Sequence, residues 1–257
     1  MRFLIISSFI LVVFSSCKKN SSSDVEITFS PGSGVSDVNG NFYPSIILGN
    51  GQEWTTVNLR TSNYSNGDPI SNAMSEVSWS NTNSGAWCHY DNDASNDETY
   101  GKLYNFHAII GDTIALEKLI SDNDGNIIDT LYYDSFTCKI CPQGWKIPYE
   151  DDWIDLINYL GNSNVAGGKM KENSLLYWKS PNVGATNESG FSGLPGGIRK
   201  ANGSFEYITE MGRWWSFEGA YQDYGHSRPL HYDQEATMNH YVFDKSGGLS
   251  VRFIKSN

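Results

Sequence analysis

The chain has 257 residues, of which 39% are hydrophobic and 14% aromatic, a composition typical of one large globular domain or two small ones. Its formal net charge of -11 argues against a nucleic-acid partner, because binding to phosphate backbones depends on clustered lysine and arginine. Twenty-five glycines beside 8 tryptophans, 15 tyrosines and 12 phenylalanines favour a loop-rich fold over a helix bundle.

Residues 1–16 have the three parts of a secretory signal peptide: a basic start at Arg2, an apolar run over residues 3–14, and two serines directly before Cys17. The apolar run is shorter than the roughly 20 residues that a membrane-spanning helix needs. Its end resembles the lipobox of bacterial lipoproteins, in which the cysteine is acylated and becomes the new N-terminus. We therefore expect a lipid on Cys17, a polar tether over residues 17–30, and a protein anchored to the outer membrane, at its periplasmic face or at the cell surface. An ordinary signal peptide with an incidental cysteine is the alternative.

Residues 31–257 predict a single domain, because no second linker, charge block or internal repeat interrupts them. The Asn39-Gly40 pair predicts a type I′ hairpin turn. Strands are expected to follow over residues 42–48 and 53–59.

The clearest predicted helix runs from Glu150 to Leu160, where apolar residues recur at helical spacing and acidic residues open the first turn. A second, aromatic-rich helix is predicted from about Tyr100 to Ile109. Residues 113–136 predict a long hairpin with its tip at residues 122–126. Strands, helices and strands again, without regular alternation, indicate an α+β fold with short antiparallel strands, two main helices and long loops.

A series of motifs closely resembles the Fibrobacter succinogenes major paralogous domain, a family abundant in lipoproteins of Bacteroidetes. The resemblance covers about residues 36–255, and the family is similar to the C-type-lectin-like superfold. It implies an exported domain of that fold and of largely uncharacterised role. The motifs are DVNGNFY at 37–43, WTTVNLR at 54–60, YSNGDPI at 64–70, WCHYDND at 87–93, YGKLYNF at 100–106, CPQGWKIP at 141–148, AGGKMK at 166–171, GFSGLPGG at 190–197, WWS at 214–216 and SVR at 250–252.

Three cysteines remain after lipidation, and an oxidising compartment favours one disulfide among them. The family resemblance has positions for Cys88 and Cys141 and none for Cys138, so it implies a Cys88–Cys141 bond. Such a bond would close a loop of about fifty residues and contribute on the order of 4 kcal/mol. A local Cys138–Cys141 bond is the alternative. Redox or zinc chemistry is not expected, because no second C-x-x-C motif accompanies this one.

An acidic loop containing Asp91, Asp93 and Asp97 is the densest cluster of the oxygen ligands that calcium prefers. It lacks the glycine and the glutamate of an EF-hand loop, and the sequence has neither the EPN nor the QPD triplet of sugar-binding C-type lectins. A solvated acidic loop is the simpler interpretation, and we expect no metal or other cofactor.

The most promising binding surface is the aromatic segment over residues 218–240, because tyrosine and arginine are enriched in binding patches. Trp214 and Trp215 suggest a stacking platform for sugar rings, although adjacent strand positions point to opposite faces and place one of them in the core. The candidate ligand-binding residues are Tyr221, Tyr224, Arg228, His231 and Trp215.

The sequence contains neither the H-E-x-x-H motif of zinc hydrolases nor the G-x-S-x-G motif of serine hydrolases. We therefore expect a lipid-anchored binding module that recognises a glycan or a protein, and not an enzyme. A structural envelope protein is one alternative. A glycan-active enzyme is another, and it would need two carboxylates facing one cleft, roughly 5 to 10 Å apart.

Overall fold

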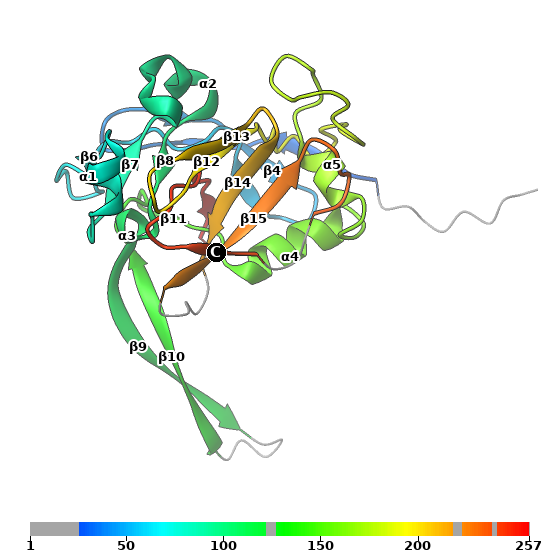
Figure 1. Cartoon of the computed structure of the whole chain (residues 1–257). Helices are drawn as coiled ribbons and strands as arrows, with labels where there is room; N and C mark the ends of the chain where they lie inside the picture. Colours follow the sequence, from blue (N-terminus) through cyan, green and yellow to red (C-terminus); the bar gives the residue numbers. More distant parts are fainter. Residues whose placement is uncertain (1–25, 122–126, 218–222, 238–240, 257) are drawn as a thin grey trace, which may run out of the picture.

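The computed structural model describes residues 26–121, 127–217, 223–237 and 241–256. The predicted signal segment, Cys17 and most of the predicted tether lie outside these ranges, as does the predicted hairpin tip. None of the helices within the ranges is long and apolar enough to cross a membrane. Short strands and short helices are joined by long loops (Figure 1), which confirms the predicted α+β class.

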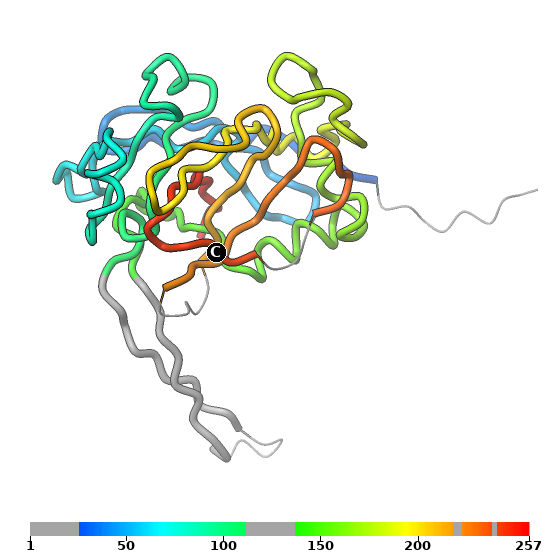
Figure 2. The backbone as a smooth tube through the Cα atoms, viewed as in Figure 1, coloured from blue at the N-terminus to red at the C-terminus, as the bar shows by residue number. Residues whose placement is uncertain are grey.

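The largest sheet joins the two ends of the described chain. Its five strands lie in the order β1-β4-β5-β17-β11, and every neighbouring pair is antiparallel. The last strand, β17, therefore lies between β5 and β11, and Figure 2 shows the course of the chain from the N-terminus to the C-terminus. Phe29 of β1 pairs with Leu48, and the folded part therefore starts before the predicted boundary at residue 31. The strands are β1 (Phe29–Pro31), β4 (Ser45–Leu48), β5 (Glu53–Thr55), β11 (Trp145–Lys146) and β17 (Ile254–Lys255).

Five smaller sheets contain the other described strands, and of their pairs only β6 with β7 is parallel. Two of these sheets have three strands, in the orders β6-β7-β8 and β14-β15-β16. The three-stranded sheets are formed by β6 (Ser71–Asn72), β7 (Ala86–Cys88), β8 (Leu103–Tyr104), β14 (Met211–Ser216), β15 (Tyr224–His231) and β16 (Tyr241–Asp244). The strand pairs are β2 (Val35–Ser36) with β3 (Phe42–Tyr43), β9 (Ile110–Ser121) with β10 (Ile127–Cys138), and β12 (Gly196–Arg199) with β13 (Phe205–Ile208).

Both predicted hairpins are present, with one correction. β9 and β10 pair antiparallel as expected. The turn between β2 and β3 is not of type I′, because only Gly40 has a positive φ (82°) and its N–H donates to the carbonyl of Asp37. Val38 and Asn39 are therefore the central turn residues, and Gly40 takes the left-handed position after them. Of the strands predicted over 42–48 and 53–59, Pro44 separates β3 from β4, and β5 ends at Thr55.

The predicted helix at residue 150 is confirmed as α4 (Glu150–Tyr159). The N–H of Tyr149 donates to the carboxylate of Asp152 at 2.7 Å, which caps the first turn. Trp153 is fully buried and lies 4.7 Å, between ring centres, from Trp54 of the large sheet. Burying each such side chain contributes about 2 kcal/mol, so this apolar stripe fixes the helix on the sheet. The other helices outside residues 90–109 are α1 (Glu76–Ser80) and α5 (Ala166–Met170).

The second predicted helix, from Tyr100 to Ile109, is wrong as a continuous element. The structure has α2 (Asp97–Tyr100), then strand β8, then α3 (Phe106–Ile109). Gly101 ends α2 with a φ of 73°, and β8 pairs with β7. The side chain of Asn105 accepts from the N–H of Ala108 and starts α3. The aromatic content of residues 100–109 suggested one helix. Gly101 and the pairing of β8 with β7 divide this segment into two short helices with a strand between them.

The disulfide joins Cys138 and Cys141, whose Cα atoms are 5.5 Å apart. The favoured Cys88–Cys141 pairing is therefore wrong and the local alternative is correct. Cys88 is a free, fully buried thiol in β7, packed in a cluster with Trp79 and Tyr90. Burial raises the pKa of the Cys88 thiol to about 12, so that it stays protonated and unreactive.

Candidate functional site

The candidates of the predicted aromatic surface do not come together among the residues that the structure describes. Arg228 and Trp215 are wrong as surface residues, because both are fully buried. Tyr224 is exposed and His231 is half-buried, but they lie at opposite ends of the eight-residue strand β15. Tyr221 lies outside the described residues. The described candidates therefore do not converge on one binding surface.

Contacts far along the chain explain why these side chains are buried. Arg228 forms an ion pair with Glu150, in the first turn of α4. Trp214 and Trp215 do point to different sides of β14, as expected, but each enters its own hydrophobic cluster. The indole N–H of Trp215 donates to the carbonyl of Tyr104 at 2.7 Å. Because both indole rings are buried in hydrophobic clusters, neither Trp214 nor Trp215 can stack on a sugar ring.

Two of the three candidate carboxylates of the acidic loop form hydrogen bonds within the protein. Asp93 accepts from the N–H of Ser95, which starts the short 3₁₀ helix η2, and Asp97 accepts from the ammonium of Lys102 at 2.7 Å. Asp91 is exposed, at a φ of 53°. In the part of the chain that the structure describes, no group of three or more His, Cys, Asp or Glu side chains could hold a metal ion. The 3₁₀ helices of this loop are η1 (Tyr90–Asn92) and η2 (Ala94–Asn96).

The described surface includes three hollows of similar size, and two of them offer no free charged group. The first of these, of about 350 Å³ beside the disulfide, is lined by Lys146, whose ammonium lies 2.9 Å from the carboxylate of Asp152. Another, of about 260 Å³, is lined by Asp37, whose carboxylate accepts from the N–H groups of Asn39 and Asn41. In both hollows the charged side chain already has a partner within the protein.

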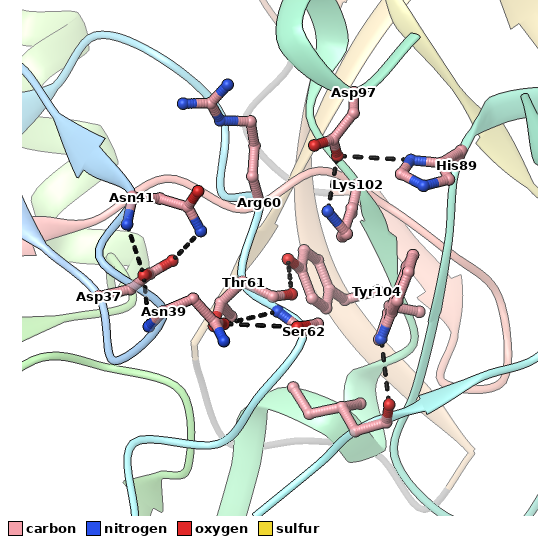
Figure 3. A network of polar contacts seen from close by, with 12 residues as sticks. Asp37, Asn39, Asn41, Arg60, Thr61, Ser62, His89, Asp97, Lys102 and Tyr104 are labelled. Atoms are coloured by element: carbon pink, nitrogen blue, oxygen red, sulfur yellow. Dashed lines mark hydrogen bonds and ion pairs between the residues drawn. The ribbon is translucent and has the colours of Figure 1, made fainter. Parts of the chain in front are cut away.

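The third hollow, which we call the Arg60 hollow, is different. It has a volume of about 270 Å³. Arg60 is half-buried, and its guanidinium makes no hydrogen bond or ion pair with any residue that the structure describes (Figure 3). Its five N–H donors are therefore available to a ligand. The lining residues are Phe42, Pro44, Val57, Asn58, Arg60, Glu98, Thr99 and Gly101.

The backbone of Arg60 is held firmly although its side chain is open. Its N–H donates to the hydroxyl of Tyr43 at 3.0 Å, and that buried hydroxyl donates to Asp37. Burial, together with this hydrogen bond, raises the pKa of Tyr43 well above its ordinary value. Tyr43 therefore stays a neutral phenol that can both accept and donate.

The next residues are fixed to the turn between β2 and β3. The hydroxyl of Thr61 and the N–H of Ser62 both donate to the side-chain carbonyl of Asn39, at 2.7 and 3.0 Å. On the other side, the hydroxyl of Tyr104 donates to the carbonyl of Thr61 at 2.7 Å (Figure 3). A side chain on so constrained a backbone loses little freedom when it binds a ligand.

His89 belongs to the neighbouring part of the same network. Its imidazole lies 3.4 Å from the carboxylate of Asp97, which also binds Lys102 (Figure 3). Burial lowers the pKa of His89, against the opposing effect of Asp97. The ring is therefore neutral at physiological pH and adds no positive charge beside the hollow.

A family model named Fibrobacter succinogenes major domain matches residues 48–255. The chain belongs to this family. The match confirms the resemblance seen in the sequence and includes Arg60 and Glu98, whereas Phe42 precedes the matched range. A search of curated proteins and a search of solved structures found no match.

In this Fibrobacter succinogenes major domain protein, the Arg60 hollow presents a guanidinium, a carboxylate and an apolar side chain. A guanidinium is a planar fork that can hold a carboxylate through two parallel hydrogen bonds. Glu98 is exposed and forms no ion pair or hydrogen bond with the described residues, and Phe42 is 55% exposed. Each of the three hollows is lined by at most one carboxylate, so none of them presents the pair that glycoside hydrolysis requires.

Sequence reasoning missed Arg60, Phe42 and Glu98. Arg60 and Phe42 lie in the quoted motifs at residues 54–60 and 37–43, and that position was the only available signal. Arg60 is notable because its guanidinium has no partner among the described residues, and the sequence does not show which arginines find one.

Proposed function

We propose that this Fibrobacter succinogenes major domain protein is an exported, lipid-anchored binding module of the cell envelope. In this proposal the lipid is on Cys17, the domain has a C-type-lectin-like fold, and the ligand binds in the Arg60 hollow. The signal-like segment and the serines before Cys17 support the anchor. The α+β architecture with long loops is compatible with the superfold that the family resembles.

The observation that carries the binding role is the open guanidinium on a fixed backbone. Arg60 is the one cationic residue lining the three hollows that has no partner among the described residues. Binding sites combine an apolar wall with a few well-placed polar groups. Phe42, Pro44 and Val57 supply such a wall.

A screen of the full chain against glycan and peptide arrays, with and without EDTA, tests the binding role. We expect ligands whose binding is lost in Arg60→Ala and unchanged by EDTA. Retention of every ligand by Arg60→Ala would place the site elsewhere, and sensitivity to EDTA would favour the acidic loop. If no array ligand binds and a chromogenic glycoside is turned over, the enzyme alternative replaces this proposal.

The anchor has its own test. Cys17→Ser should move the protein from the membrane fraction to the soluble fraction and abolish incorporation of labelled palmitate, because acyl chains supply about 0.8 kcal/mol of membrane affinity per buried CH₂. Membrane association that persists in this variant would contradict lipid anchoring.

A further inference from the structure

We infer that the Arg60 hollow binds a sugar unit that carries one carboxylate, a uronate, and this inference rests on the proposed binding function. The guanidinium of Arg60 holds the carboxylate, the ring of Phe42 contacts the apolar face of the sugar, and Glu98 with Thr99 accepts hydrogen bonds from its hydroxyl groups. All four residues line the same hollow.

The need for a carboxylate follows from Arg60. Its guanidinium is always charged, and a neutral ligand that displaced water from it would leave the charge without a counterion. Charge-assisted hydrogen bonds are roughly twice as strong as neutral ones, and the two oxygens of a carboxylate match the guanidinium fork. A ligand with a single carboxylate neutralises the charge of this group and uses two of its donors.

Glu98 limits the negative charge of the ligand. It lines the hollow and forms no ion pair with Arg60, and the whole chain carries a formal charge of -11. A phosphate or a second carboxylate would place extra negative charge against Glu98 and against this field. The acceptable ligand therefore has one carboxylate and otherwise neutral groups.

The other lining residues, Glu98, Phe42 and Val57, favour a sugar over a peptide C-terminus as the ligand. An ionised Glu98 can only accept hydrogen bonds, so the ligand must present donors, and the hydroxyl groups along a sugar edge do so. Phe42 is 55% exposed and Val57 is 37% exposed, and these apolar surfaces suit the C–H face of a pyranose ring. A volume of about 270 Å³ is slightly below the usual range for small-molecule sites, which favours a single sugar unit over a long polymer segment.

Isothermal titration of the full chain with matched probes tests this inference. The probes are methyl glucuronide, methyl galacturonide, the methyl ester of each, methyl glucoside, and a short peptide with a free or an amidated C-terminus. We expect one of the two uronates to bind at least about tenfold more tightly than its ester and than the glucoside, since that factor corresponds to the loss of one charge-assisted bond pair.

Variants assign the contacts. Arg60→Lys should keep the charge but lose the fork, with affinity for the uronate falling about tenfold, and Arg60→Gln should abolish the difference between uronate and ester. Phe42→Leu should weaken uronate and ester by the same factor, because it removes stacking but no charge. Tyr224→Ala is the matched control, since Tyr224 is 48% exposed and lies outside the hollow, and it should leave affinity unchanged.

Three results would overturn the inference. Equal affinity for uronate and glucoside, both lost in Arg60→Gln, would show a neutral-sugar site and leave the proposed function intact. Binding of the free peptide terminus alone would show a protein ligand in the same hollow. The absence of uronate binding by the folded wild-type chain would reject the uronate, and loss or retention of array ligands in Arg60→Ala would then decide the proposed function separately.

Discussion

Arg252 and Arg60 show two different uses of the same side chain, connected through Asn58. Arg252 is 1% exposed and donates to Asn58 and to the carbonyls of Thr55, Phe191 and Ser192. Arg60 lines the hollow that Asn58 also lines, and its guanidinium has no partner in the described structure. The partners of an arginine, more than its identity, decide whether it supports the fold or is open to a ligand.

The physical reason lies in the cost of burying a charge. An arginine removed from water must have its donors bonded, or the fold loses several kcal/mol. Four acceptors meet this need for Arg252 without a carboxylate, and burial lowers its pKa to about 9. Arg60 remains partly hydrated, so that leaving it unpaired is tolerated. Substitution of Arg252 should therefore affect stability, and substitution of Arg60 should affect binding.

The largest effect is expected for Arg252→Met. The change leaves the buried carbonyls of Thr55, Phe191 and Ser192 without a donor, at about 1 kcal/mol each, whereas the side-chain oxygen of Asn58 keeps the indole N–H of Trp214. Loss of the guanidinium over the ring of Phe191 adds roughly 1 kcal/mol. The free energy of unfolding in urea titrations should therefore fall by about 4 kcal/mol. Arg60→Met should change it by less than about 0.5 kcal/mol, as is usual for surface side chains that make no hydrogen bond or ion pair with the described residues. If the two variants lowered the free energy of unfolding equally, Arg252 and Arg60 would not differ in their contribution to the fold.

Lys171 and Lys179 show the same contrast between a buried and an exposed cation. Lys171 is fully buried, and its ammonium donates to the carbonyls of Val183, His231 and Gln234. Lys171→Met should lower the free energy of unfolding by about 3 kcal/mol, because three acceptors lose their donor. Lys179→Met is the control, since the exposed Lys179 pairs with Glu210 and lies over the ring of Tyr232, and such exposed contacts contribute about 0.5 kcal/mol each.

These cations also show what could be predicted from the sequence. α4 was predictable because its apolar spacing and acidic first turn are local. Arg228 was misread as a surface residue because its partner, Glu150, lies 78 positions away, and the helix predicted over residues 100–109 failed because β8 pairs with the distant β7. The proposed role of Arg60 depends on the absence of hydrogen bonds and ion pairs to its guanidinium among the described residues. A local sequence pattern cannot predict such an absence.

The disulfide lies at the border between the core and a hollow, because Cys138 and Cys141 pack against a buried hydrophobic cluster and also line the hollow of about 350 Å³. Its short loop gives about 2 kcal/mol in the chain-entropy model, so Cys138→Ser with Cys141→Ser should lower the free energy of unfolding by that amount. Peptide mapping without reductant should recover a linked Cys138–Cys141 peptide, with Cys88 alkylated only after unfolding. A fragment linking Cys88 to Cys141 would refute the observed pairing.

The smallest effect concerns histidines, which can give up their charge on burial where arginine cannot. Burial lowers the pKa of His89, His107 and His231. The stability that results is fully present above the ordinary value near pH 6.5 and is lost as the pH falls through the lower folded-state values. The urea midpoint should therefore decline between pH 7.5 and 5.5, and NMR titration of the three rings should give pKa values below 6.5. Values above 6.5 would reverse the predicted slope.

The most direct test of the account is an NMR titration of the arginine side-chain Nε–Hε signals with the preferred methyl uronide, with Arg60 assigned through Arg60→Lys and Arg252 by its protection from exchange with water. We expect the Arg60 signal to shift until the site is saturated with the uronide, while the Arg252 signal does not move. A bound uronide that leaves the Arg60 signal unchanged would contradict the central claim that this open arginine is the binding group.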